Sequence, residues 1–254
     1  MSGNEVHPDL RRIAVVTPRQ LVGPRTLPVM RALIVVAGLR MSRTPPDIEV
    51  LTLESGVGVR LYRPAGSNEP APALLWIHAG GYVMGTAQQD DRLCLRFSSR
   101  LGITVASVDY RLAPENPYPA ALAFQLLVYP MLDDRPSIAP ANPHYRLWNG
   151  RANRFGWRAY LGDADARVAV PGRRDDLGGL APAWIGVGTH DLLHDEDLAY
   201  AERLTAAGVP CQVEVVEGAF HGFDRVAPNV GVSQRFFTSQ CNSLRAALAL
   251  SNRT

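Results

Sequence analysis

Two residues of this chain have the types and spacing of a proton-transfer pair. Asp191 and His221 lie 30 positions apart, and each follows a run of apolar residues typical of a buried strand. A histidine held by a carboxylate can act as a general base and then as a general acid, because the carboxylate fixes the tautomer of the imidazole and stabilises the imidazolium. We therefore expect Asp191 and His221 to meet at the carboxyl edge of a parallel sheet, where ligands of open α/β folds bind.

A glycine-containing loop earlier in the chain is a second candidate for chemistry. His78-Ala79-Gly80-Gly81 directly follows the apolar run 73–77. Glycine permits close approach of the backbone to a ligand and backbone angles that other residues avoid. Gly80 and Gly81 could therefore present their amides to a negatively charged oxygen that develops during a reaction. The alternative interpretation is a tight turn after a buried strand.

A nucleophile that would work with these groups is missing from the sequence. Such a serine normally lies in a Gly-x-Ser-x-Gly turn between a strand and a helix. None of the twelve serines has this context: Gly231-Val232-Ser233-Gln234-Arg235 comes closest, but it lacks the final glycine and follows His221. Cys94 lacks a comparable glycine-flanked turn, and we expect it to be a buried structural thiol.

Apolar runs alternate with segments of helical spacing along most of the chain. The runs are 48–53, 57–62, 73–78, 103–109, 124–129, 183–188 and 212–216, and the helical segments are 91–101, 194–207 and 232–250. This alternation predicts an α/β fold with a mostly parallel sheet covered by helices on both faces. The first two runs are expected to pair across Glu54-Ser55-Gly56. The continuous apolar character of Ala73–His78 predicts a strand buried on both faces.

One connection is too short for this architecture. Neighbouring parallel strands need a crossover of a dozen or more residues, which normally contains a full helix. Between the runs ending at Asp109 and starting at Phe124, Pro114, Pro117 and Pro119 leave only Ala120–Ala123 for a helix. The connection predicts a helix that begins and is then cut. The alternative is a short loop that joins elements which are not neighbours.

Five motifs in this order make the chain resemble the hormone-sensitive-lipase-like branch of the α/β-hydrolase esterases. They are His78-Ala-Gly-Gly-Tyr-Val-Met-Gly85, Asp109-Tyr-Arg-Leu-Ala-Pro-Glu115 with Tyr118-Pro-Ala-Ala121, Leu127-Val-Tyr-Pro130, Gly188-Thr-His-Asp191 with Asp195-Glu196, and His221-Gly-Phe223. The resemblance implies hydrolysis of acyl esters through an acyl-serine intermediate, without a cofactor or metal. It assigns Gly80 and Gly81 to the oxyanion hole and Asp191 and His221 to catalysis. His78 would shape the loop.

The chain departs from the family pattern at two places. The family's loop usually reads His-Gly-Gly-Gly, where this chain has Ala79. In the family, the point reached at Ala121–Ala123 is followed by the rest of a helix, a central strand, a Gly-Asp-Ser-Ala-Gly turn and another helix. The pattern resumes at about Phe124. The resemblance thus implies a deletion of roughly 40 to 60 residues between about residues 121 and 124, on typical element and loop lengths.

Size and composition indicate one domain of an ordinary globular protein. The 254 residues carry a net charge of +2 with scattered arginines, which speaks against nucleic acid as a partner. Three widely spaced cysteines argue against a disulfide framework. We expect a helical cap arm over residues 1–46, closed by Pro45-Pro46, and an internally truncated α/β-hydrolase domain over 47–254.

The same sequence features set expectations for location and partners. Leu27–Leu39 is apolar but too short to span a bilayer, and the start lacks a signal-peptide layout, so we expect a cytoplasmic protein without stable membrane insertion. The Leu27–Leu39 stretch either covers a pocket or touches a lipid surface. A small-molecule ester or another hydrophobic ligand is the expected partner, and a homodimer is possible.

Two further groups of residues leave alternatives open. His190 and His194, four positions apart and beside acidic residues, could bind zinc, or they could belong to the acidic first turn of a helix. Trp148, Phe155, Trp157 and Tyr160 either belong to a helical cover over a pocket or are ordinary core aromatics.

Three functional hypotheses remain. The first is a carboxylic ester hydrolase family member that is catalytically defective because no serine elbow is present. The alternative is a non-catalytic pseudoenzyme that binds a small ligand. The third is an incomplete product of an internal deletion, since a sheet that loses its central strand leaves buried amides and carbonyls unpaired.

Overall fold

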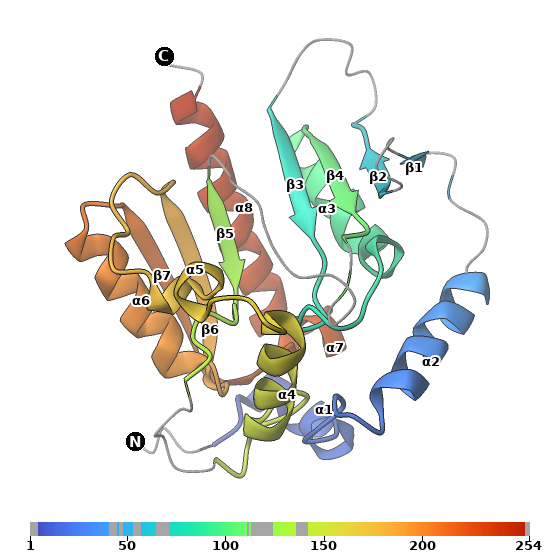
Figure 1. The fold of residues 1–254 in the computed structure, drawn as a ribbon. Coiled ribbons are helices and arrows are strands. Elements are labelled where there is room, and N and C mark those ends of the chain that lie inside the picture. The colour runs from blue at the N-terminus through green and yellow to red at the C-terminus, as the bar shows by residue number, and fades with distance from the viewer. Residues whose placement is uncertain are drawn as a thin grey trace. The chain divides into compact units, whose positions relative to one another are not determined.

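The computed structural model of the chain describes residues 5–40, 45, 48–52, 57–64, 72–110, 112, 124–135 and 142–251. The chain divides into two compact units, residues 1–23 with 118–254, and residues 24–117. Each unit contains a sheet of its own (Figure 1). The predicted cut helix at Ala120–Ala123 and the turn at Glu54–Gly56 lie outside the described residues. The predicted division at residue 46 stays a prediction.

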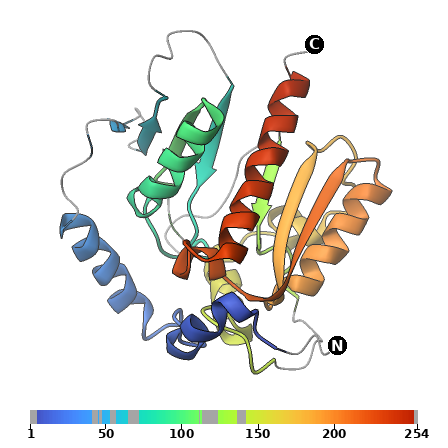
Figure 2. The ribbon, with the colours of Figure 1, turned by 180° about the vertical axis from the view of Figure 1, so that it is seen from behind.

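The unit of residues 24–117 is built on four strands in the order β1-β2-β4-β3. They are β1 (Ile48–Thr52), β2 (Gly58–Tyr62), β4 (Thr104–Val108) and β3 (Ala73–Ile77). The pairs β1–β2 and β2–β4 are antiparallel, and β3–β4 is parallel. A short 3-10 helix η2 (Ala87–Asp90) leads into α3 (Asp91–Leu101), which lies along one face of this sheet (Figure 2). The helix α2 (Leu27–Arg40) belongs to the same unit.

A buried ion pair fastens α3 to the sheet. Both oxygens of Asp91 accept hydrogen bonds from the guanidinium of Arg60, at 2.8 and 2.7 Å, and Oδ1 also accepts one from the hydroxyl of Tyr62 at 2.7 Å. All three residues are buried, and a bidentate arginine–carboxylate pair fixes geometry as well as charge. The helix ends at Gly102, whose φ of 67° is a left-handed conformation that favours glycine.

The prediction that Ala73–His78 forms a strand buried on both faces is wrong for β3, although His78, directly after the strand, is buried. β3 alternates between exposed and half-buried residues, with Leu75 43% and Ile77 49% exposed. Among the described strands β3 pairs only with β4, so it lies at an edge of its sheet. Its apolar sequence suits an interior strand, but no described element covers its exposed side chains.

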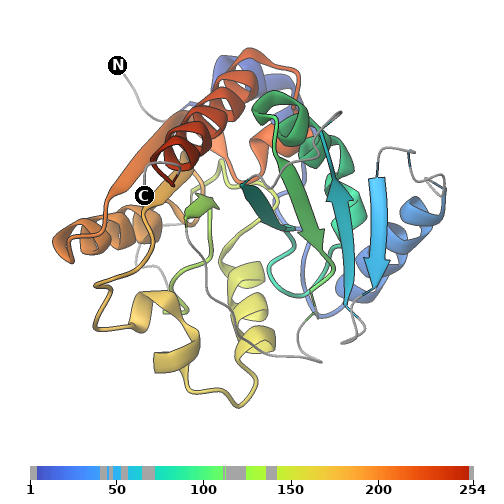
Figure 3. The same cartoon turned by 90° about the horizontal axis from the view of Figure 1, so that it is seen from above.

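The other unit is built on three parallel strands in the order β5-β6-β7. They are β5 (Gln125–Val128), β6 (Ala183–His190) and β7 (Cys211–Phe220). The helices α6 (His194–Ala206) and α8 (Gly231–Ser251) cover opposite faces of this sheet (Figure 3). The remaining elements are η1 (Pro8–Leu10), α1 (Arg11–Val16), α4 (Gly150–Leu161), α5 (Ala166–Ala169), η3 (Pro171–Arg173) and α7 (Phe223–Val226).

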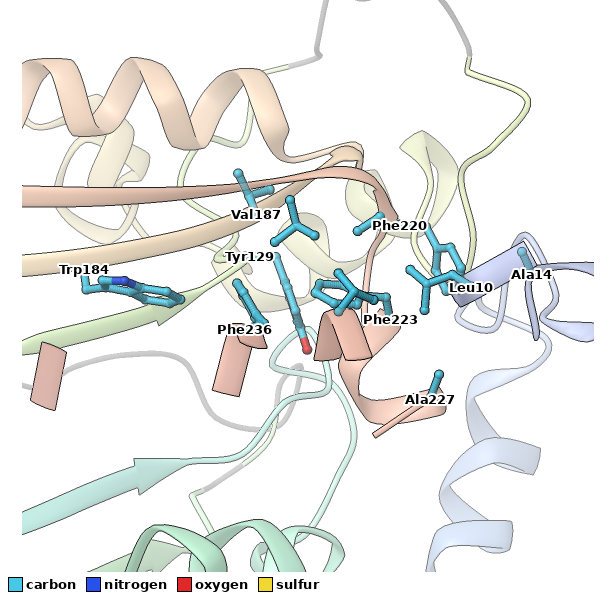
Figure 4. Close-up of a cluster of buried hydrophobic side chains, with 12 residues drawn as sticks. Leu10, Ala14, Tyr129, Trp184, Val187, Phe220, Phe223, Ala227 and Phe236 are labelled. Atoms are coloured by element: carbon cyan, nitrogen blue, oxygen red, sulfur yellow. The ribbon is translucent and has the colours of Figure 1, made fainter. Parts of the chain in front are cut away.

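The core of this unit lies between the sheet and α8. Trp184, Phe220, Phe223 and Phe236 are almost fully buried there, and Leu10 and Ala14 from the start of the chain pack into the same cluster (Figure 4). The start of the chain is further held by a hydrogen bond of 2.8 Å from the amide of His7 to the carbonyl of Gly218. The N-terminal segment up to residue 23 is therefore part of this unit rather than of the one that contains α2.

Most sequence-predicted elements are present in the structure. The helices predicted at 91–101, 194–207 and 232–250 and all seven apolar runs are formed, with ends that differ by a few residues. The run predicted to end at Val216 continues to Phe220, which makes His221 the first residue after β7. No helix in the described ranges is both long enough and apolar enough to cross a membrane.

Candidate active site

Asp191 and His221 are in contact at the carboxyl ends of two neighbouring parallel strands. Asp191 follows β6 and His221 follows β7, and Oδ2 of Asp191 lies 2.9 Å from Nδ1 of His221. The other oxygen, Oδ1, accepts a hydrogen bond of 3.0 Å from the amide of Leu193. The side chain of Asp191 is fully buried, whereas 20% of the His221 side chain is exposed. The carboxylate is therefore fixed in the interior, and the imidazole reaches from it toward the surface.

Two aromatic rings hold the imidazole of His221 in place. The ring of Tyr129 lies 4.6 Å from it, and the ring of Trp148 stacks against it at 5.9 Å. Tyr129 is itself anchored, because its hydroxyl donates to Oδ1 of Asp224 at 2.9 Å. Burial raises the pKa of Tyr129 well above its usual range, which keeps the phenol as a hydrogen-bond donor. Gly222, directly after the histidine, has a φ of 71° that lets the chain turn there.

Sequence reasoning missed the role of Tyr129 and only partly anticipated that of Trp148. Tyr129 belongs to the motif Leu127-Val-Tyr-Pro130, and its φ of 38° at the end of β5 orients its side chain toward His221. The sequence leaves open whether Trp148 belongs to a helical cover or to the core. In the structure Trp148 is 5% exposed and lies beside His221. Trp157, from α4, is also buried and packs on Tyr160.

Two further carboxyl groups lie close to Asp191 on the first turn of α6. Glu196 accepts hydrogen bonds from the amides of Leu132 at 2.9 Å and Asp133 at 3.2 Å. The pKa of Glu196 is raised to about 8, mainly by burial and in part by the charges of Asp133 and Asp191, while the two amide hydrogen bonds oppose the rise. Burial also raises the pKa of Asp197, and neither of its carboxyl oxygens has a hydrogen-bond partner among the described residues. Both groups therefore favour their protonated forms near the buried carboxylate of Asp191.

The predicted oxyanion loop lies in the unit of residues 24–117, directly after β3. Gly80 and Gly81 have φ values of 146° and 57°, and neither amide donates a hydrogen bond to any described residue. The carbonyl of Gly80 accepts from the amides of Val83 and Met84, both at 3.2 Å, which closes the loop. A Cβ at Gly80 would collide with the backbone of Met84, so only glycine fits there.

His78 and Tyr110 hold the base of this loop. His78 is 3% exposed and its ring stacks on Tyr110 with the centroids 4.2 Å apart. The hydroxyl of Tyr110 donates to the carbonyl of His78 at 3.0 Å. A Cβ at Gly85 would collide with the His78 ring, so this glycine allows the ring to pack inside the loop. The geometry agrees with a loop-shaping role for His78, which stays a prediction.

The zinc alternative at His190 and His194 does not fit the local structure. His190 ends β6 and His194 begins α6, so the two side chains do not share the face of one helix. The buried His190 ring stacks on His144, and burial lowers its pKa, while His194 lies 2.8 Å from a carboxyl oxygen of Asp195. No group of three or more potential ligands arranged for a metal ion occurs in the part of the chain that the structure describes.

The structure offers no substitute for the missing serine among the residues discussed above. Cys94 is fully buried within α3, and burial raises its pKa, which disfavours the thiolate. Ser233 is buried in the first turn of the regular helix α8, not in a strained turn at the end of a strand. The arrangement in this unit can accept and return a proton at His221, but no nucleophile accompanies it.

Comparison with known proteins identifies the group to which this arrangement is similar. A family model described as alpha/beta hydrolase fold matches residues 74–123 and 121–225. Esterase LipI of Mycobacterium tuberculosis is 30% identical over 243 residues, which cover 70% of this chain and 76% of LipI. Ethyl acetate hydrolase of Pseudomonas putida is 28% identical over 236 residues, covering 66% of this chain and 71% of the relative. The crystal structure of esterase LipW from Mycobacterium marinum superposes with a TM-score of 0.81 at 31% identity, covering 97% of each chain.

In both alignments the relatives have residues at positions where this chain has a gap. The LipI alignment spans 243 positions, but 70% of 254 residues is about 178, so about 65 positions have no residue of this chain. The same calculation for ethyl acetate hydrolase, 236 positions against about 168 residues, leaves about 68. The two segments of the family match meet at residues 121–123, where the sequence predicts a cut helix.

Proposed function

Because the chain belongs to the α/β-hydrolase fold family, with esterases among its relatives, we propose that it is a carboxylic ester hydrolase relative that has lost its nucleophile. The family match and the structural neighbours confirm both the resemblance and the predicted fold class. The defect in catalysis is the part that we propose. The chain keeps the acid, the base and the glycine loop of an ester hydrolase, and it lacks the serine that would attack the ester.

One observation carries this proposal. Asp191 and His221 form a 2.9 Å pair at the carboxyl ends of β6 and β7, while no Gly-x-Ser-x-Gly sequence exists anywhere in the chain. In a serine hydrolase the base takes the proton of the serine hydroxyl and returns it to the leaving alcohol. Without that hydroxyl no acyl-serine intermediate can form, so proton transfer at His221 does not lead to ester cleavage by this route. Removal of the nucleophile from a comparable triad costs on the order of 10⁶ in kcat.

The alignments and the sheet edges support loss of a whole segment rather than of a single residue. About 65 positions of LipI lack a counterpart, close to the roughly 40 to 60 residues expected for helix, strand and helix. In the two described sheets, β3 pairs only with β4 and β5 pairs only with β6. We propose that the missing segment contained the strand that paired with both β3 and β5, together with the serine turn.

Hydrolysis of p-nitrophenyl butyrate by the purified full chain tests the proposal. The chain is compared with His221→Ala and with His194→Ala, a matched control at a partly exposed histidine outside the pair. We expect the three proteins to release p-nitrophenol at the same rate. Activity that disappears in His221→Ala and persists in His194→Ala would show that an unrecognised nucleophile works with His221, and the proposal would then be wrong.

A thermal melt of the same samples separates a defective hydrolase from a ligand-binding pseudoenzyme. A binding protein that keeps an ester pocket is stabilised by its ligand, so its melting temperature rises with the concentration of a non-hydrolysable ester analogue. We expect no such rise, because the segment that would complete the sheet is missing. A saturable rise that depends on His221 would favour the binding function instead.

A further inference from the structure

The loop of residues 142–149 passes over the carboxyl ends of β6 and β7, next to the proton-transfer pair. It leads into α4, and the ring of Trp148 near its end stacks on His221 at 5.9 Å. The side chain of Leu147 packs against the residue after His221, because a Cβ at Gly222 would lie 2.9 Å from its Cδ1. The contacts that hold this loop in place therefore control access to His221.

Two contacts fasten the start of the loop to His190, the last residue of β6. The ring of His144 stacks on the ring of His190 with the centroids 4.6 Å apart and 25° between the ring planes. Nδ2 of Asn142 lies 3.2 Å from Nδ1 of His190. His190 is only 2% exposed, so both contacts are made away from water.

The orientation of Asn142 determines which nitrogen of His190 carries a proton. Oδ1 of Asn142 accepts a hydrogen bond of 2.8 Å from the amide of His144, so the amino group of this side chain faces His190. An amino group of this kind only donates. Nδ1 of His190 is therefore the acceptor, and the neutral ring holds its proton on Nε2. Protonation of Nδ1 would place two donors against each other and abolish the hydrogen bond.

The surroundings of His190 also disfavour a charged ring. Burial lowers its pKa, and so does the charge of His144. The carboxylate of Glu217 in β7 and the backbones of Glu5 and Thr189 act in the opposite direction without cancelling this effect. When the loop opens, His190 meets water and the ring of His144 leaves it, so its pKa returns toward the ordinary 6.5. Protons therefore bind more strongly to the open form, and acid favours opening.

The other end of the loop is held by hydrogen bonds that do not respond to acid. The guanidinium of Arg146 donates to the carbonyl of Ala14 at 2.8 Å. The amide of Leu147 donates to the carbonyl of Pro18, also at 2.8 Å. Arginine keeps its charge in proteins, and backbone amides and carbonyls do not titrate. The response of the loop to pH is therefore located at the end that meets His190.

We propose that Asn142, His144 and His190 form a pH-sensitive latch for this loop. The latch keeps the 142–149 loop closed over His221 near neutral pH and releases it in acid. The proposal rests on the contacts of the loop and does not depend on whether a nucleophile is present. As the pH falls below about 6.5, the ratio of open to closed loop rises by up to about tenfold per pH unit for the one proton that His190 takes up.

Hydrogen–deuterium exchange of the full chain tests the latch. Mass spectrometry follows the 142–149 loop at pH ~7.5 and pH ~5, with correction for the intrinsic pH dependence of amide exchange and with β7 as the internal reference. His190→Gln removes the titrating ring. Asn142→Asp replaces the amino group by a carboxylate oxygen, which accepts from protonated His190. Asn242→Asp makes the same change at an exposed position of α8, as a matched control.

In the parent chain and in Asn242→Asp, we expect the protection of the loop to fall by about fivefold to thirtyfold between pH ~7.5 and pH ~5, with β7 unchanged. The protection of the loop should stay constant in His190→Gln. In Asn142→Asp it should stay constant or rise in acid, because a carboxylate stabilises a protonated imidazole. Asn142→Asp decides the test if His190→Gln fails to fold.

Three results would overturn the proposal. The first is a loop whose protection in the parent chain is the same at both pH values. The second is an equal fall of protection in the parent chain and in Asn142→Asp. The third is a fall in β7 as large as that in the loop, since it would mean that acid unfolds the whole unit and does not release a latch.

Discussion

The substitution Glu196→Gln isolates the contribution of one buried carboxyl group to stability. Glu196 lies in the first turn of α6 and accepts hydrogen bonds from the amides of Leu132 and Asp133 through the same oxygen, Oε1. Burial raises its pKa to about 8, from an ordinary value of 4.5. Glutamine keeps the accepting oxygen and nearly the same volume, but it does not ionise. The substitution therefore removes the titration and leaves the contacts.

The sign and size of the expected effect follow from this pKa. The folded protein holds the proton on Glu196 to higher pH than the unfolded chain does, so unfolding releases a proton. The free energy of unfolding therefore falls as the pH rises from about 4.5 to about 8. At about 1.36 kcal/mol for each pH unit, the full interval corresponds to roughly 5 kcal/mol, of which about 3.5 kcal/mol falls between pH ~5 and pH ~8. The glutamine variant lacks this loss.

Urea unfolding measured at pH ~5 and at pH ~8 is the appropriate assay. Three of the four tryptophans, Trp148, Trp157 and Trp184, are buried in the unit that contains α6, so tryptophan fluorescence reports mainly the unfolding of this unit. The control is Glu202→Gln, an exposed position on the same helix. We expect Glu196→Gln to gain about 3 to 4 kcal/mol over the parent chain on going from the lower to the higher pH. Glu202→Gln should follow the parent.

Other buried carboxyl groups make the comparison between variants essential. Asp224 also has a raised pKa because of burial, and it destabilises the parent and the variant alike as the pH rises. The difference between the two proteins is free of this common contribution. It contains the titration of Glu196 together with its effect on Asp197, whose pKa is raised by burial and also by the charge of Glu196. If the free energies of Glu196→Gln and of the parent change in parallel between the two pH values, Glu196 does not titrate in this range and the reasoning is refuted.

Two further substitutions test the packing of the same unit. Asp197→Ala removes a fully buried carboxyl group that has no hydrogen-bond partner among the described residues. At pH ~8 the free energy of unfolding should therefore rise by about 1 to 3 kcal/mol in the same urea titration. A decrease would instead reveal a partner that stabilises the carboxylate. Gly218→Ala places a Cβ against the backbone of Glu5 and His7 at a φ of 68°, so it should lower the free energy of unfolding by about 2 kcal/mol. It should also speed cleavage near the start of the chain in limited proteolysis, and unchanged protection there would contradict the inferred docking.

The sequence was sufficient to predict the strands and the proton-transfer pair. Asp191 and His221 each follow a run of apolar residues, and parallel strands bring their carboxyl ends to one edge, so the 2.9 Å contact follows from topology. The glycine loop was equally readable, because positions such as Gly80 tolerate only glycine. In each case a local pattern determines the local structure, and the family resemblance then supplies the candidate role.

Features that depend on distant contacts were not readable from local patterns. The apolar run Ala73–Ile77 is typical of an interior strand. In the structure this strand pairs with β4 on one side and with no described strand on the other, and the sequence of the run does not reveal this. The contacts of Tyr129 and Trp148 with His221 join residues more than 70 positions apart. Likewise, periodicity does not decide which side of the mostly apolar α2 is turned inward. That side is fixed by the hydrogen bond from Arg31 to the carbonyl of Val83.

The edge strand β3 is expected to make the association of this protein depend on the protein concentration. Natural edge strands are usually protected from pairing with other chains by charges, prolines or bulges, and Ala-Leu-Leu-Trp-Ile has none of these. In the part of the chain that the structure describes, no strand pairs with the edge of β3 opposite β4, and the side chains of Leu75 and Ile77 are exposed beside it. An unpaired edge of this kind is a template for an extended segment of another chain. Pairing of two copies is second order in protein, whereas folding is first order. An association of two copies through β3 would therefore depend on the protein concentration, whereas folding would not.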